Sequence, residues 1–164
     1  MIAALALTIL AAVTTPSPVE SAAPAYFAPP KGWSPMQLPP GAPVDFAWLS
    51  PNYHPSGENI TVTVRTVPAG ATLDSEVREA TAEAVQDGKS VATSEAYATC
   101  AGTEPGWTID IRVRVTATRV VSQLQHIAVH GDKAYVIMYT HTAGSPIEKD
   151  VYDSIGSLCP ATRT

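Results

Sequence analysis

The chain has 164 residues, of which 45% are hydrophobic, and its 15 acidic residues against 10 Lys and Arg give a formal net charge of −5. This length and hydrophobic content fit one compact domain with a core of ordinary size. A protein that grips nucleic acid needs a cation for each phosphate that it contacts, so the acidic balance argues against a nucleic-acid partner.

The N-terminal residues are predicted to form a secretory leader. The first twelve, MIAALALTILAA, are apolar and too few for a helix that spans a bilayer, which needs about 20 residues. Ala23 and Ala25 satisfy the rule of small residues at the cleavage site, so residues 1–25 are predicted to be a signal peptide. With this leader, we expect a secreted or periplasmic protein. The alternative is that these residues form a hydrophobic first strand of the fold.

Two cysteines, Cys100 and Cys159, lie in the part of the chain that would be exported. An even count in an oxidising compartment favours one disulfide over two reactive thiols. The alternative is a nucleophilic thiol paired with one of the four histidines. Neither cysteine is near the leader, so we expect no lipid-attachment cysteine and no stable membrane anchor.

A Pro-rich segment follows the leader. Residues 24–55 hold nine of the 15 prolines, interleaved with aromatic residues. This composition is too aromatic for an idle linker and too interrupted for long regular elements, so residues 26–43 are predicted to form an extended arm laid against the domain. The domain itself is predicted over residues 44–164 and begins with a short edge strand at 44–49.

The next two elements show a change of period. Apolar residues alternate with polar ones in NITVTVR, residues 59–65, which predicts a strand with one wet face that carries Arg65. Apolar residues then recur at helical spacing, with Thr72 as the N-cap and Gly88 where the helix would stop. A weak, alanine-rich strand over 91–101 is predicted to end at Cys100.

Three further strands are predicted from alternation and turn residues. Residues 107–116 alternate most clearly, and a two-residue turn at Ala117 and Thr118 leads into a strand over 119–130. A second two-residue turn, Gly131-Asp132, leads into a strand over 133–141.

The chain is predicted to close with a capped helix. In SPIEKDVYDSIGSLC, Ser145 is the expected N-cap, Pro146 the first helical residue and Glu148 the partner in a capping box. The predicted order is then strand, strand, helix, four strands, helix. This order predicts an α+β fold with an antiparallel sheet of about six strands and two helices. A cystine would then staple the closing helix to the sheet corner at CAGTEPGW.

The chain resembles the PsbP/Mog1-like superfamily. The resemblance rests on the order of elements, the GW that opens the central strand, the hairpin HIAVHGDKAYVIMYT and the closing helix that ends SIGSLC. The resemblance covers roughly residues 48–159. Within the superfamily, the chain is similar in particular to secreted bacterial members of the LpqN-type lipoprotein kind, although it lacks their lipid-anchor cysteine. The resemblance implies a PsbP/Mog1-like fold and a non-catalytic binding or assembly role, and no residue role is carried over.

A polar face of the sheet is the candidate binding site. The two-residue turn at Ala117 and Thr118 predicts that Gln123 lies opposite Arg112 and that Gln125 lies opposite Asp110. The candidate residues for recognition of a peptide, a glycan or a partner protein are Arg65, Asp110, Arg112, Arg114, Gln123 and Gln125. The alternative is a solvated face of charge pairs.

No catalytic residue, metal or cofactor is predicted. His126 and His130 are four residues apart on a strand, a separation of about 13 Å that no single metal ion spans. We expect His126 to be a core-edge histidine with a local hydrogen bond, facing Ile137. The expected function is a secreted, monomeric, non-catalytic binding or accessory module. One alternative is a small secreted hydrolase that uses His126 or His141, which a hydrogen bond from either histidine to a serine or carboxylate in a pocket would favour. Another is an inhibitor-like fold that presents the Pro-rich arm to a partner, which a mobile arm would favour.

Overall fold

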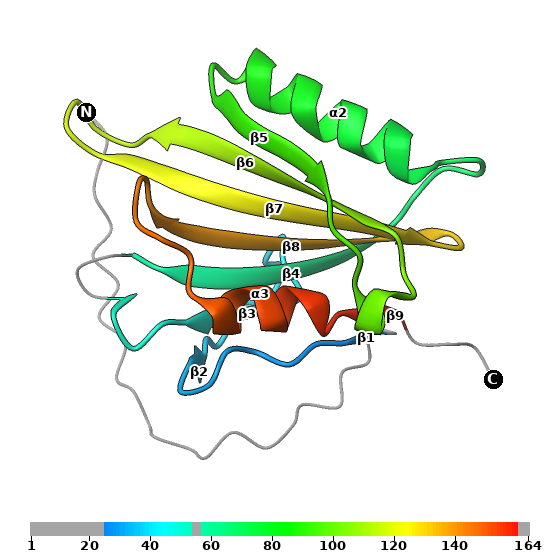
Figure 1. The fold of residues 1–164 in the computed structure, drawn as a ribbon, viewed down its shortest axis with the longest axis horizontal. Helices are drawn as coiled ribbons and strands as arrows, with labels where there is room; N and C mark the ends of the chain where they lie inside the picture. The colour runs from blue at the N-terminus through cyan, green and yellow to red at the C-terminus, as the bar shows by residue number, and fades with distance from the viewer. Residues whose placement is uncertain (1–24, 54–56, 161–164) are drawn as a thin grey trace.

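A computed structural model describes residues 25–53 and 57–160, and its elements follow the predicted order closely (Figure 1). The strands and helices are β1 Ala25–Tyr26, β2 Ser34–Pro35, β3 Phe46–Leu49, β4 Asn59–Thr66, α2 Leu73–Gln86, β5 Ser90–Ala96, the 3-10 turn η1 Cys100–Gly102, β6 Gly106–Arg114, β7 Val120–His130, β8 Lys133–Thr142, α3 Lys149–Gly156 and β9 Cys159–Pro160. The predicted α+β class, with two helices and an antiparallel sheet, is confirmed.

The main sheet has seven strands in the order β2-β3-β4-β8-β7-β6-β5, and all neighbours are antiparallel. About six strands were expected, and the extra one is β2, two residues of the Pro-rich arm that pair with β3. A pair so short is formed by tertiary contact and leaves no alternation in the sequence. Strands β1 and β9 form a separate two-stranded sheet.

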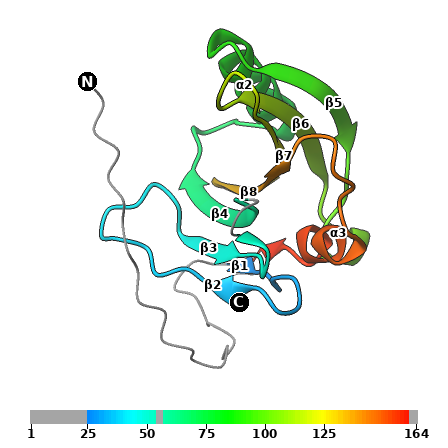
Figure 2. The same ribbon diagram turned by 90° about the vertical axis from the view of Figure 1, so that its left-hand side faces the viewer.

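The two helices cover opposite faces of the main sheet, and each covers a different half (Figure 2). Helix α2 packs over β5, β6 and β7, where Ile109, Ile111 and Ile127 are buried beneath it. Helix α3 packs on the other face over β4, β8 and β7, against a cluster that includes Ile60 and Ile137. We call these the α2 face and the α3 face. Alternate residues of each strand belong to one face or the other.

The Pro-rich arm lies on the α3 face. Trp33 is buried in the same cluster as Ile60 and contacts the ring of Tyr139 with a centroid distance of 6.2 Å. Phe27 lies 5.1 Å from Trp48, between ring centroids. The arm therefore forms part of the cover of this face and contributes aromatic side chains to its core.

The start of α2 was predicted correctly and the start of α3 was not. The Thr72 side chain accepts a hydrogen bond from the amide of Ser75, as expected for the N-cap. Helix α3 begins at Lys149, with Glu148 at the N-cap position and no side-chain cap bond, so the capping box at Ser145 is wrong. The amide of Ser145 instead bonds the carbonyl of Thr142 in the turn that ends β8, and the chain then crosses the end of the sheet before it becomes helical (Figure 1).

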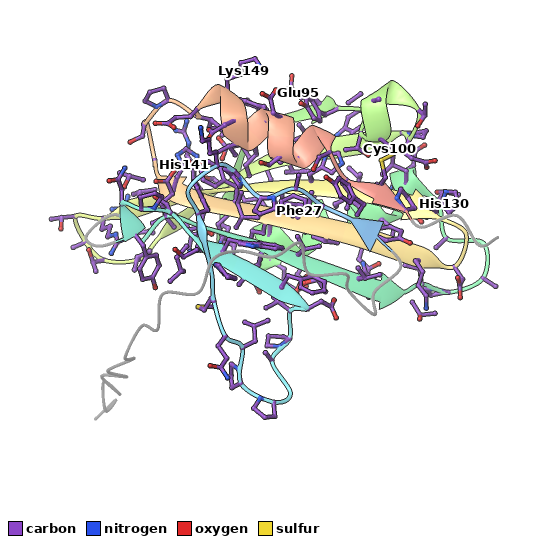
Figure 3. All side chains as sticks on the ribbon, turned by 90° about the horizontal axis from the view of Figure 1, so that it is seen from below. Phe27, Glu95, Cys100, His130, His141 and Lys149 are labelled. Atoms are coloured by element: carbon purple, nitrogen blue, oxygen red, sulfur yellow. A yellow bond between two sulfur atoms is a disulfide. The ribbon has the colours of Figure 1, made fainter. Side chains whose placement is uncertain are left out.

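The predicted disulfide joins Cys100 and Cys159, with their Cα atoms 4.6 Å apart, and its yellow bond lies beside the Cys100 label in Figure 3. Its surroundings differ in detail from the prediction. Strand β5 ends at Ala96, and Cys100 lies in η1, where it and Ala101 have φ angles of 51° and 55°. Cys159 belongs to β9 beyond the last turn of α3. The disulfide therefore ties the segment after α3 to the corner between β5 and β6.

Candidate functional site

The register between β6 and β7 separates the residues that were predicted to share one face. The turn is longer than two residues, because the amides of Val115 and Thr116 both bond the carbonyl of Arg119. Asp110 pairs with Leu124 and Arg112 pairs with Ser122, so the predicted pairing with Gln125 and Gln123 is wrong. A shift of one residue moves a side chain to the other side of a sheet.

Asp110, Arg112 and Arg114 lie on the α3 face, on the half that α3 leaves open. We define the charged surface as these three residues of β6 together with Thr93 and Glu95 of the neighbouring strand β5. All are exposed except Asp110, which is half-buried. Within the described part of the chain, the side chains of Arg112 and Glu95 form no hydrogen bond or ion pair.

A buried polar row borders the charged surface. Ser122 is opposite His141 in the register, and its hydroxyl donates to the carboxylate of Asp110. His141 is 6% exposed and stacks on Tyr139 with a centroid distance of 4.7 Å, and its Nδ1 is buried with no partner among the described residues. Burial lowers the pKa of His141, partly opposed by Asp110 and Glu58. The imidazole is therefore kept neutral at pH 7.

This row has the residue types of a hydrolytic site without the corresponding bonds. A serine nucleophile needs its proton accepted by the histidine. Here the Ser122 hydroxyl donates to Asp110, and within the described residues His141 forms no hydrogen bond to a serine or carboxylate. The Tyr139 hydroxyl and the Ser50 hydroxyl both donate to Glu58, so that carboxylate is also occupied.

The other histidines have separate surroundings. His126 faces Ile137 as predicted, is fully buried, and its Nδ1 lies 3.2 Å from the Thr108 hydroxyl. Burial lowers its pKa to about 4. The local hydrogen bond expected of this residue is confirmed.

His130 and His141 lie at opposite ends of the sheet (Figure 3). His130 is exposed, and its Nδ1 lies 3.2 Å from the carboxylate of Glu104. Among residues 25–53 and 57–160, no group of three His, Cys, Asp or Glu could hold a metal ion. His54 lies outside the described residues.

Gln123 and Gln125 lie on the α2 face, on the half that α2 leaves open. They are joined there by side chains from β8, which pairs with β7, and from β4, which pairs with the other side of β8. We define the uncharged surface by six of the half-buried residues there, Thr61, Thr63, Gln123, Gln125, Met138 and Thr140. Four of the six were not predicted from the sequence. They occupy alternate positions in NITVTVRT and KAYVIMYTHT, and the hairpin register between β7 and β8 places them on the same face as the glutamines.

Arg65 is on the α2 face but apart from the glutamines. It pairs with Ala134, four residues along β8 from Met138, which pairs with Gln125. Its guanidinium forms an ion pair with Glu76 of α2, whose side chain is only 3% exposed. In the fold, Arg65 therefore neutralises the buried carboxylate of Glu76 on the inner side of α2.

A groove runs between the arm and α3. Its volume is about 220 Å³, and it is open to solvent. It is lined by Ala28, Pro29, Pro30, Lys31, Asp150, Asp153 and Ser154. In the part of the chain that the structure describes, no helix is long and apolar enough to cross a membrane.

No protein-family model matches the sequence, and no match is found among curated proteins. Solved structures do match. The solution structure of cyanobacterial PsbP (CyanoP) from Synechocystis sp. PCC 6803 aligns with a TM-score of 0.59 and 16% identity, over 90% of this chain and 98% of that chain. The chain has a PsbP-like fold.

A crystal structure from Bacteroides thetaiotaomicron VPI-5482 also matches. It aligns with a TM-score of 0.52 and 14% identity, over 85% of this chain and 49% of that chain. The match to CyanoP confirms the PsbP part of the resemblance seen in the sequence at the level of the fold. At these identities the likeness concerns the fold alone.

Proposed function

We propose that this PsbP-like protein is an exported, non-catalytic binding or accessory module that docks on another protein through its uncharged surface. The observation that carries the proposal is the open half of the α2 face. Six half-buried side chains lie side by side there on three adjacent strands, and none is charged. Depletion of charge at the centre and enrichment in methionine are typical of protein interfaces, and Met138 lies in the middle of this surface.

The chemistry of the uncharged surface favours a folded protein over the other ligands considered. Strands β4, β8 and β7 are internal to the sheet, so their backbone groups are already paired and an extended peptide could not add to them. None of the six side chains is aromatic, so a sugar ring would find no face on which to stack. The glutamine amides and threonine hydroxyls supply both donors and acceptors for a polar partner.

Export is supported by two features. The disulfide between Cys100 and Cys159 persists in oxidising compartments and is rare in reducing ones. The apolar leader of residues 1–25 is the route by which the chain would reach such a compartment. We propose a secreted or periplasmic monomer with no stable membrane anchor, whose partner is a protein and not a nucleic acid.

The proposal is tested by matched arginine substitutions. Gln125→Arg places a charge in the uncharged surface, and Gln86→Arg places the same charge on exposed α2. The tagged wild type and both variants are made in the source organism, and the proteins that co-purify from the extracytoplasmic fraction are quantified. We expect one partner to be retained by the wild type and by Gln86→Arg and to fall at least tenfold with Gln125→Arg. Equal recovery with both variants would contradict docking through this surface.

A further inference from the structure

Strand β5 leaves one edge of the main sheet free. It is the last strand in the order, and within the described chain it pairs only with β6. Six of its seven residues are exposed, Val91 being the exception. Natural edges are commonly blocked by lysine and other charged side chains, by proline, by a bulge or by a covering segment. The sequence SVATSEA contains no lysine or proline; its one charged residue is Glu95, and its one bulge lies between Val91 and Thr93, which leaves the regular stretch from Thr93 to Ala96 for an added strand.

The outward backbone groups of β5 follow from the ladder. The amide of Tyr97 bonds the carbonyl of Gly106, so this pair points toward β6. Antiparallel pairs alternate between bonded and non-bonded residues. Ala96 and Ser94 therefore direct their amides and carbonyls away from β6. These are the groups that an added strand would use.

The charged surface lies beside this edge. Arg112 pairs with Ser90, a residue too small to cover the guanidinium, and its side chain is exposed. A strand added outside β5 would be two strand spacings from β6, about 10 Å. An extended arginine and a glutamate on the added strand together cover that distance. Arginine recognises a carboxylate with two parallel hydrogen bonds.

We propose that the free edge of β5 binds an extended, acidic segment of another protein, which adds to the sheet as a further strand. The backbone of Ser94 and Ala96 bonds the segment, and Arg112 pairs with a carboxylate on it. Glu95 lies on the same face near the other end of β5 and repels an acid there. The acidic residue of the segment therefore lies at the Ser90 end. This site is separate from the uncharged surface.

A random-peptide library selected against the purified, oxidised protein tests the proposal. We expect peptides rich in β-formers with an acidic residue to be enriched. Ala96→Pro should weaken the selected peptides at least tenfold, because it removes an outward amide that the ladder with β6 does not use. The matched Ala96→Thr variant keeps the amide and should bind as the wild type does. Gln125→Arg should also bind normally, which separates this site from the uncharged surface.

Charge reversal gives a second, independent result. Selection against Arg112→Glu should replace the acidic residue of the peptides with a basic one. Circular dichroism and a thiol titration check that each variant is folded and oxidised. Three outcomes would overturn the proposal: no acidic peptide is enriched, Ala96→Pro and Ala96→Thr bind equally, or the protein pairs through β5 with a second copy of itself and excludes the peptide.

Discussion

The uncharged surface and the charged surface are the two halves of the sheet that its helices leave open, and they differ in what they offer a partner. The uncharged surface lies on the central strands β4, β8 and β7, where the backbone is already paired. The charged surface lies on β6 and β5, next to a strand whose outer backbone groups have no partner in the described chain. Side chains alone mediate recognition at the first, whereas backbone and side chains both contribute at the second.

The difference follows from where each helix packs. Helix α2 covers the β5 half of one face, and α3 with the Pro-rich arm covers the β4 half of the other. One sheet can therefore present two surfaces of different chemistry on opposite sides. The covers also differ in how they are held. A disulfide ties the chain beyond α3 to the sheet corner, whereas α2 has an N-cap and the ion pair between Arg65 and Glu76.

Removal of the disulfide should have the largest effect and should act mainly on the α3 side. The cysteines are 59 residues apart, and closing such a loop stabilises a fold by about 4 kcal/mol on the chain-entropy model. We expect Cys100→Ala/Cys159→Ala to lower the free energy of unfolding in urea by that amount and to speed amide exchange in α3 more than in α2. Reductant should reproduce the loss in the wild type and leave the variant unchanged. A loss below about 1 kcal/mol would contradict this role.

Low pH should have the second-largest effect on stability, through a buried histidine on the α3 face. Burial lowers the pKa of His126 from 6.5 to about 4, so the unfolded chain binds this proton more tightly than the folded one. The stability is then fully present above pH 6.5 and declines as the pH falls toward 4, by about 3 kcal/mol at 1.36 kcal/mol per unit of pKa. The lowered pKa of His141 acts in the same direction.

The contribution of His126 is isolated by comparing the pH dependence of stability in the wild type and in a variant without the imidazole. Urea unfolding of the wild type and of His126→Gln is measured at pH 7 and pH 4.5. Carboxylates also titrate in this range, but their contribution to the change in stability is the same in both proteins and cancels in the comparison. We expect the wild type to lose more stability than the variant. Parallel pH profiles for the two proteins would show that the buried imidazole has no such effect.

Loss of the α2 cap should have the smallest effect. The Thr72 side chain accepts a hydrogen bond from the amide of Ser75, and removing an N-cap of this kind costs about 1 kcal/mol. We expect Thr72→Ala to lower the free energy of unfolding by about that amount. Thr81→Ala, within the same helix, is the control and should be neutral or slightly stabilising because alanine is the best helix former. Equal effects of the two substitutions would show that the Thr72 cap does not stabilise the protein.

The sequence was most informative where periodicity was long. Strands β4, β6, β7 and β8 and helix α2 were all predicted, because alternation or helical spacing persists through each of them. Strands β1, β2 and β9 were missed, because two-residue pairs depend on contacts between distant parts of the chain. The start of α3 was wrong because SPIE satisfies the rules of a capping box locally, while Ser145 is used in the turn after β8.

The candidate site depended on one feature that the sequence does not fix, the length of the turn after β6. A two-residue turn between Thr116 and Arg119 and a three-residue turn between Val115 and Arg119 both fit this segment, and each length gives a different register. The error divided the predicted residues between two faces, with Gln123 and Gln125 on one and Asp110 on the other. The partial cover by each helix, which leaves both sets open, is a tertiary property and has no signal in the alternation itself.

Site-specific photo-crosslinking tests docking through the uncharged surface most directly. A photo-reactive amino acid is placed at Met138, in the middle of that surface, and at Arg78 on exposed α2, in cells that export the protein. We predict one discrete adduct from position 138 that Gln125→Arg abolishes, and none with the same protein from position 78. If position 138 yields no adduct while position 78 does, the partner lies elsewhere and the proposed docking surface is wrong.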